Sequence, residues 1–168
     1  GIDLNRNWAD PDKNLHPEAY YLKRFIQKQH QVDQQETTQQ VELFCDFHGH
    51  SHKKGLFIYG CTSKGKENRN LRLEIKVFPR IFSKVESSFK YESCSFNLHD
   101  SKNSTARVVV YNMKIAKSFT LEASFCGPLN EIRQFNTRDY ERMGESFCKT
   151  LFMYATMDRT PIWKELES

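Results

Sequence analysis

The segment Val41-Glu42-Leu43-Phe44-Cys45-Asp46-Phe47 is a short apolar run, and its end merges into the polar cluster Asp46-Phe47-His48-Gly49-His50-Ser51-His52. A run of this kind predicts a buried strand. Polar side chains that follow such a strand lie where ligands gather in α/β sheets. Because side chains alternate along a strand, we expect Asp46 and His48 to point to one side. The segment therefore predicts a sheet and the edge at which to look for a site.

Three further runs extend the predicted sheet. Residues 56–60, 107–111 and 118–123 are rich in β-branched and aromatic side chains, which favour strands. Only a short polar region separates the last two runs, so we expect them to be neighbouring strands.

Apolar residues at helical spacing predict helices over about 17–30, 71–89 and 137–156. Pro79 is expected to kink or break the second helix, and Thr137 or Asp139 to cap the third. The Gln-rich run at 34–40 is expected to be a flexible surface connection. Strands mixed with helices predict an α/β fold, with a mixed, partly parallel sheet flanked by helices.

Length, charge and cysteine content exclude several classes of protein. The 168 residues suit a single domain, 1–168, and no apolar stretch is long enough to span a membrane. The net charge of +4 is spread along the chain and is too weak to indicate nucleic-acid binding. Five cysteines without a C-x-x-C pair indicate reduced thiols in a cytosolic protein. Four of them have apolar neighbours and are expected to be buried: Cys45, Cys61, Cys126 and Cys148.

The histidine cluster after the first strand is a candidate metal site. An imidazole such as that of His48 can bind zinc through one nitrogen while a nearby carboxylate holds the other. The alternative is a surface loop that is merely rich in histidine, in which His50 and His52 are solvated or hydrogen bonded.

Glu122, Arg107 and the Asn5-Arg6 pair are the other candidates for chemistry. Glu122 lies in an otherwise apolar run, so it has either an ion-pair partner or a pKa raised towards that of a general base. Arg107 is either a bidentate clamp for a carboxylate or the polar entry to a strand. A guanidinium beside an amide, as in Asn5-Arg6, can grip a carboxylate. Together these residues suit zinc-assisted hydrolysis of a negatively charged substrate.

Several motifs, in this order along nearly the whole chain, resemble the zinc metallocarboxypeptidases, in particular the cytosolic carboxypeptidase branch that includes protein deglutamylases. They are Gly-Ile-Asp-Leu-Asn-Arg-Asn-Trp at 1–8, Leu-His-Pro-Glu at 15–18, Asp-Phe-His-Gly-His-Ser at 46–51, Phe-Ile-Tyr-Gly-Cys at 57–61, Thr-Ala-Arg-Val-Val-Val at 105–110, Ser-Phe-Thr-Leu-Glu-Ala-Ser-Phe-Cys-Gly at 118–127 and Asp-Tyr-Glu-Arg-Met-Gly at 139–144.

The resemblance implies a role for each candidate residue. Glu122 would be the general base, and His48 one of three ligands of a single zinc ion (Zn2+). Asn5 and Arg6 would hold the free C-terminal carboxylate of the substrate. Arg107 falls near the position that lines the pocket for the terminal side chain, where a basic residue favours glutamate or aspartate. The expected substrates are C-terminal tails of proteins or peptides in the cytoplasm, polyglutamylated tubulin among them.

The chain departs from the family pattern in two places. None of its histidines is followed three residues later by a glutamate, although the family's other two zinc ligands come from a His-x-x-Glu segment before the Asn-Arg motif. We therefore expect a partial catalytic domain that lacks its N-terminal portion and takes two zinc ligands from outside this chain. The alternatives are a metal-free remnant that binds acidic C-terminal tails and a structural piece without a site. Lys114 stands near a position where the family commonly has a glycine.

Overall fold

The computed structural model describes residues 1–30, 41–62, 69–129 and 131–168, so the predicted connection at 34–40 lies outside the described residues. Helices and strands alternate irregularly along these ranges. In chain order they are η1 (Leu4–Arg6), α1 (Pro17–His30), β1 (Phe44–His50), β2 (Leu56–Thr62), α2 (Arg69–Val85), η2 (Tyr91–Ser93), β3 (Ser95–Asn97), η3 (Asp100–Lys102), α3 (Ala106–Asn112), β4 (Ser118–Ser124), α4 (Thr137–Thr156) and α5 (Thr160–Glu167), where η denotes a 3-10 helix.

The four strands form one mixed sheet in the order β1-β4-β2-β3. β4 runs parallel to β1, with His48 opposite Glu122, and antiparallel to β2, with Phe57 opposite Glu122. β2 and the short β3 are parallel. The predicted α/β fold with a mixed, partly parallel sheet is therefore confirmed, and the run around Glu122 occupies an interior strand.

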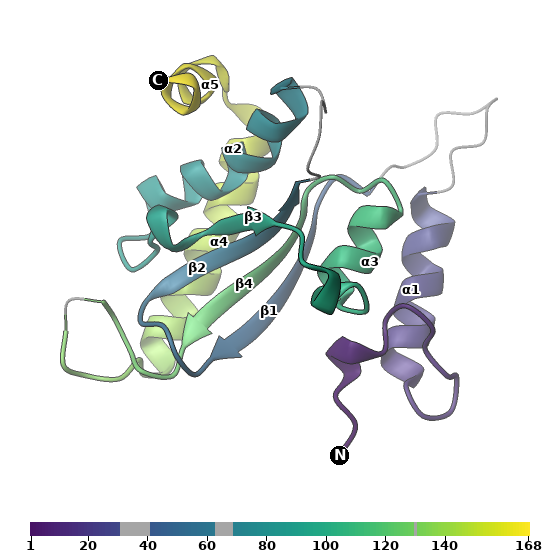
Figure 1. The fold of residues 1–168 in the computed structure, drawn as a ribbon. Helices are drawn as coiled ribbons and strands as arrows, with labels where there is room; N and C mark the ends of the chain where they lie inside the picture. Colours follow the sequence, from purple (N-terminus) through teal and green to yellow (C-terminus); the bar gives the residue numbers. More distant parts are fainter. Residues whose placement is uncertain (31–40, 63–68, 130) are drawn as a thin grey trace.

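Helices α2 and α4 cover one face of the sheet, and α5 packs against α2 (Figure 1). α2 and α4 turn apolar stripes towards the sheet, and their phenylalanines pack edge to face, with the ring centres of Phe78 and Phe147 5.2 Å apart. Phe78 also stacks on Phe119 of β4. The sequence analysis expected a kink or a break at Pro79; there is no break, because α2 continues through Pro79 to Val85.

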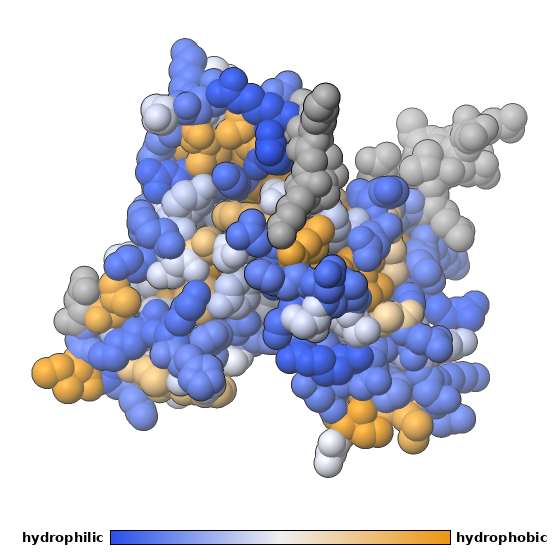
Figure 2. Space-filling model, viewed as in Figure 1, coloured by the Kyte–Doolittle hydropathy of each residue, from blue (hydrophilic) through white to orange (hydrophobic). Residues whose placement is uncertain are grey.

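The opposite face of the sheet carries α3, with α1 beyond it (Figure 1). Trp8 anchors the N-terminal segment here, because its ring meets that of Phe44 in β1 edge to face with centres 6.0 Å apart. Ile26 of α1 and Val110 of α3 complete this second, smaller cluster of buried side chains. Figure 2 shows hydrophilic residues over most of the viewed face, with hydrophobic residues exposed only in separate small groups.

Two further predictions from the sequence are wrong. Residues 107–111 form most of helix α3, not a strand next to 118–123. Their valines favour a strand locally, but the helix is fixed by tertiary contacts: the N–H of Ala106 in its first turn donates to Oδ1 of Asn5, and its apolar side is buried. Cys126 and Cys148 are exposed, whereas Cys61 is buried and Cys45 is partly buried.

The cap of α4 and two short elements also differ from what the sequence predicted. α4 is capped by Asn136, and Asp139 completes a capping box instead of being the cap itself. The short strand β3 and helix α5 were not predicted from the sequence. No helix in the described ranges is long and apolar enough to cross a bilayer.

Candidate active site

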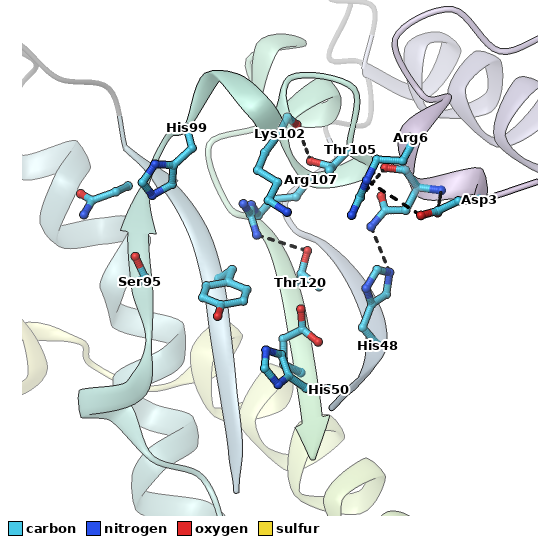
Figure 3. Close-up of a pocket in the computed structure, with 14 residues that line it drawn as sticks. Asp3, Arg6, His48, His50, Ser95, His99, Lys102, Thr105, Arg107 and Thr120 are labelled. Carbon is cyan, nitrogen blue, oxygen red and sulfur yellow. Dashed lines mark hydrogen bonds and ion pairs between the residues drawn. The ribbon is translucent and has the colours of Figure 1, made fainter. Parts of the chain in front are cut away.

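A cavity of about 540 Å³ lies on the face of the sheet that α3 covers. The sheet contributes its floor, and η1, η3 and the start of α3 form its rim (Figure 3). The five residues singled out from the sequence all line it, although they range along the chain from Asn5 to Glu122. The lining residues are Asp3, Asn5, Arg6, His48, His50, Tyr59, Ser95, Asn97, His99, Lys102, Thr105, Arg107, Thr120 and Glu122.

His48 is held by the carboxylate two residues before it. Its Nε2 lies 2.9 Å from Oδ2 of Asp46, as the alternation of side chains along β1 predicts. This hydrogen bond raises the pKa of His48 more than its partial burial lowers it, and the charges of Asp46 and Glu122 add to the rise. Because the proton of the neutral ring lies between Nε2 and Asp46, the lone pair of Nδ1 is free. No described residue hydrogen bonds Nδ1.

Glu122 sits next to His48 in the register of the parallel pair β1 and β4. It is only 8% exposed, and burial is the main reason that its pKa is raised above the ordinary glutamate value. The positive charges of His48 and Arg107 oppose that rise. A carboxyl group with a raised pKa facing a cavity suits proton transfer near neutral pH.

Asn5 connects the N-terminal segment to both sides of the site. Its Oδ1 accepts the N–H of Ala106 at 2.8 Å, and its Nδ2 contacts Nε2 of His48 at 3.3 Å, without a hydrogen bond while Nε2 carries the proton shared with Asp46. The neighbouring Arg6 is about half exposed, with Nε 3.9 Å from the carboxylate of Asp3. The local turn is fixed because Asp3 also accepts the N–H of Asn5 and so caps η1.

Arg107 is buried, yet no carboxylate among the described residues forms an ion pair with it. Its Nε makes no hydrogen bond, and its Nη1 reaches Oγ1 of Thr120 only at 3.5 Å. The guanidinium lies against the ring of Tyr59, 5.5 Å from its centre. A buried guanidinium without a carboxylate in an ion pair is costly, so Arg107 has the chemistry to bind an anion.

The sequence analysis did not single out Lys102, and it left His50 open between a solvated and a hydrogen-bonded role. Lys102 projects from η3 towards Arg107 (Figure 3). Nδ1 of His50 accepts the backbone N–H groups of His52 and Lys53, each at 3.1 Å. The signal for His50 is alternation: positions 46, 48 and 50 share one face of β1.

The described residues fit part of a zinc site. His48, with Asp46 fixing its proton, has the donor chemistry of one zinc ligand. A zinc site needs three protein ligands or more, and no group of three His, Cys, Asp or Glu side chains that could hold a metal occurs in the described ranges. His48 could therefore bind zinc only together with ligands from outside those ranges.

Comparison with known proteins agrees with the motifs. Cytosolic carboxypeptidase 3 of Bos taurus is 39% identical over 171 residues, which cover 99% of this chain and 16% of that protein. Cytosolic carboxypeptidase 4 of Mus musculus is 36% identical over 91% of this chain and 14% of its own length. The chain thus spans about a sixth of the length of the curated relatives it matches. No family model matches it.

Solved structures share the fold. A metallo-carboxypeptidase from Burkholderia cenocepacia has a TM-score of 0.74 at 19% identity, over 92% of this chain and 38% of that one. One from Pseudomonas aeruginosa has a TM-score of 0.73 at 20% identity, over 92% of this chain and 40% of that one. The predicted resemblance to the cytosolic carboxypeptidases is therefore confirmed for nearly the whole chain, and the fold is part of the metallo-carboxypeptidase fold.

Proposed function

We propose, from the similarity of nearly the whole chain to one segment of the cytosolic carboxypeptidases, that it is part of the catalytic domain of a zinc carboxypeptidase. It removes acidic residues, above all glutamate, from the C-terminal tails of proteins or peptides in the cytoplasm. Glutamate-rich tails such as those of polyglutamylated tubulin are the proposed substrates. The observation that carries the proposal is that Glu122, His48 and Arg107, whose Nε makes no hydrogen bond, share one cavity.

Asn5 and Arg6 bind the terminal carboxylate. The Arg6 guanidinium is accessible at the rim of the cavity, and its contact with Asp3 is long at 3.9 Å, so a substrate carboxylate can compete for it. Holding the substrate by its end restricts cleavage to the last residue and brings the scissile bond to Glu122 and His48. Positioning of this kind accounts for a large part of the rate in oriented reactions.

Arg107 binds the side chain of the terminal residue. Its buried guanidinium lacks a carboxylate partner, and a glutamate side chain supplies one. The contact with Tyr59 and Thr120 holds the guanidinium in place before the substrate arrives. A terminal lysine or arginine would put a second cation into the same buried space, so the cavity selects against it.

Glu122 transfers the proton. Its carboxylate takes a proton from the attacking water and passes it to the leaving amine. Zinc, when bound with the help of His48, polarises the scissile carbonyl and lowers the pKa of the water. Asp46 keeps the ring of His48 in one orientation and one tautomer throughout.

A second candidate function is the binding of acidic tails without hydrolysis. It is favoured by the absence, within the described ranges, of three side chains that could hold a metal. In that case Arg6 and Arg107 bind acidic tails in the same cavity, and Glu122 performs no chemistry.

Both candidate functions require the binding of acidic C-terminal tails, and a peptide-binding assay tests this shared step. We expect the purified chain to bind a fluorescein-labelled peptide ending in glutamate, and to lose binding when the peptide is C-terminally amidated or ends in lysine. Arg107→Met should abolish the preference for glutamate over alanine at the last position. Lys117→Met, which removes a cation paired with Glu42 away from the cavity, is the matched control. Equal binding of the free and amidated peptides would refute both candidates.

Metal content and glutamate release distinguish the carboxypeptidase from the binding protein. This test needs a longer protein that also carries the two zinc ligands expected from outside these 168 residues. In that protein, about one zinc per molecule by elemental analysis, with release of free glutamate that Glu122→Gln abolishes without weakening peptide affinity, supports the carboxypeptidase. Peptide binding without zinc and without release, in the presence of added zinc, supports the binding protein instead. An active Glu122→Gln variant would reject the role of Glu122.

A further inference from the structure

His50 is held in one orientation at the end of β1. Its Nδ1 accepts backbone hydrogen bonds from His52 and Lys53, each at 3.1 Å, which fold the chain back after the strand. The ring of Phe57 packs edge to face against it, with centres 5.1 Å apart. Because Nδ1 accepts, the neutral ring carries its proton on Nε2.

The Nε2–H of His50 has no hydrogen-bond partner among the described residues. His50 lines the same cavity as His48 and Glu122, two residues further along the face of β1. Figure 3 places it at the opposite end of the cavity from Arg107 and Lys102. A fixed donor therefore faces the cavity on the side away from Arg107.

Lys53 is not among the lining residues of the cavity, but it places a cation over the ring of Tyr59, which is one of them. Its Nζ lies 5.0 Å from the ring centre of Phe57 and 5.3 Å from that of Tyr59, the rings that also flank His50 and Arg107. No described acidic side chain forms an ion pair with Lys53. An ammonium held over two aromatic rings is oriented but keeps its donors for another partner.

We propose that His50 and Lys53 form a second acidic subsite, which binds the side chain of the residue before the terminal one. This rests on the proposed function. With the terminal carboxylate at Asn5 and Arg6 and the terminal side chain at Arg107, the rest of the peptide leaves the cavity on the side of His50. A carboxylate there accepts from the Nε2–H and pairs with the ammonium at once. The protein thereby reads runs of acidic residues, not only the last one.

Peptides of the form Ala-Ala-Ala-Ala-Xaa-Glu, with Xaa as Glu, Gln or Lys, test the subsite. We expect the 168-residue chain to bind the Glu-Glu peptide roughly three- to tenfold more tightly than the Gln-Glu peptide, as measured by fluorescence anisotropy. The Lys-Glu peptide should bind more weakly still, because it places a cation next to Lys53.

Substitutions at His50 distinguish its proposed role in the subsite from its role in holding the turn after β1. In His50→Asn, the shorter amide oxygen can still accept the N–H groups of His52 and Lys53, but the distal donor is gone. We expect it to lose most of the preference for glutamate at Xaa while keeping the melting temperature and the preference for a terminal glutamate. Lys53→Met should act in the same way. Lys54→Met, whose ammonium donates to the carbonyl of Glu131, is the matched control and should leave the preference unchanged.

The outcomes distinguish this inference from the function on which it rests. Equal affinity for the Glu-Glu and Gln-Glu peptides, or full preference retained in both His50→Asn and Lys53→Met, overturns the second subsite while the terminal site stands. If no peptide ending in glutamate binds at all, the proposed function fails and the subsite with it.

Discussion

Lys114 has a φ of 74°, in the left-handed region that favours glycine. It joins α3 to β4, and its N–H donates to the carbonyl of Tyr111 at 2.9 Å, so the conformation is fixed by the turn. The resemblance places a glycine near this position, and the backbone gives the physical reason. Since the turn positions the start of β4 relative to α3, it also sets the spacing between Arg107 and Glu122.

We expect Lys114→Gly to stabilise the protein by about 1 kcal/mol, because glycine adopts this conformation without the clash of Cβ. The free energy of unfolding from urea titration measures the change. Lys114→Ala keeps Cβ and is the control, which should gain nothing. A gain in the alanine variant equal to that in the glycine variant would show that the lysine side chain, not its backbone conformation, is the cost.

Glu86 is a buried carboxylate outside the site, with 1% of its surface exposed. It accepts hydrogen bonds from the N–H and Oγ of Ser88 at 2.9 and 2.6 Å and from Oγ of Ser146 at 3.0 Å. Burial alone would raise its pKa, but these hydrogen bonds and the charge of Arg142 together lower it. The ionised form therefore links the end of α2 to α4.

A pKa lowered by folding contributes stability above the ordinary glutamate pKa and loses it as the pH falls through that value and below. We expect Glu86→Gln to cost about 1–3 kcal/mol at pH 7, because it weakens the acceptor for three donors. The loss should shrink as the pH falls below about 4, where the wild-type carboxyl also becomes protonated. Urea titrations at several pH values measure this. Glu145→Gln, an exposed residue paired with Lys149, should change little.

At the scale of elements, the helical spacing of apolar residues and the residues typical of helix ends made the long helices predictable. The expected helices at 17–30 and 137–156 are α1 and α4. α3 was not predictable in this way, because three consecutive valines favour a strand locally and the contacts that make them a helix come from Asn5, a hundred residues earlier. Local pattern therefore identified Arg107 as a candidate but assigned it to the wrong kind of element.

The residues of the candidate site could be named from the sequence, but their arrangement could not. All five residues line one cavity. His48 and Glu122 were singled out as polar groups in or after apolar strands, whereas Asn5, Arg6 and Arg107 lie in η1 and α3 and were singled out by residue type and by the resemblance. His50 could not be assigned a role from the sequence, since a histidine in a polar turn looks the same whether its ring is solvated or fixed. The turn after β1 and the ring of Phe57 fix it, and both depend on the paired strands.

The capping box of α4 gives a prediction at the element scale. Asn136 accepts the N–H of Asp139, and Asp139 accepts that of Asn136. Arg133 pairs with the same carboxylate and holds the pKa of Asp139 down to about 2. We expect Asn136→Ala to destabilise the protein by about 1 kcal/mol, and Asn136→Asp to keep the cap. Thermal melting compares them; equal losses in both variants would mean that capping is not the cause.

At the scale of the whole molecule, the site joins two separately packed halves. Glu122 and His48 stand on the sheet, whose other face is packed against α2 and α4, with α5 on α2. Asn5 and Arg107 belong to the N-terminal segment and α3, which the smaller cluster around Trp8 holds against β1. Under the proposed function, substrate binding would therefore depend on both clusters, because the proposed anchoring groups and the proposed proton-transfer group lie on different halves.

Trp8→Ala should accordingly loosen the half that carries Asn5 and leave the half that carries Glu122 folded. Losing the ring that packs on Phe44 removes the main anchor of the N-terminal segment, so we expect amide protection to fall in η1 and α1 while β4 keeps its protection. Hydrogen exchange with mass spectrometry measures both, and affinity for a peptide ending in glutamate should fall because Asn5 and Arg6 lose their position. Phe82→Ala, in the larger cluster, should instead lower protection across the sheet. Uniform loss of protection in Trp8→Ala would mean that the clusters unfold as one unit, and the division of the site between two halves would then be wrong.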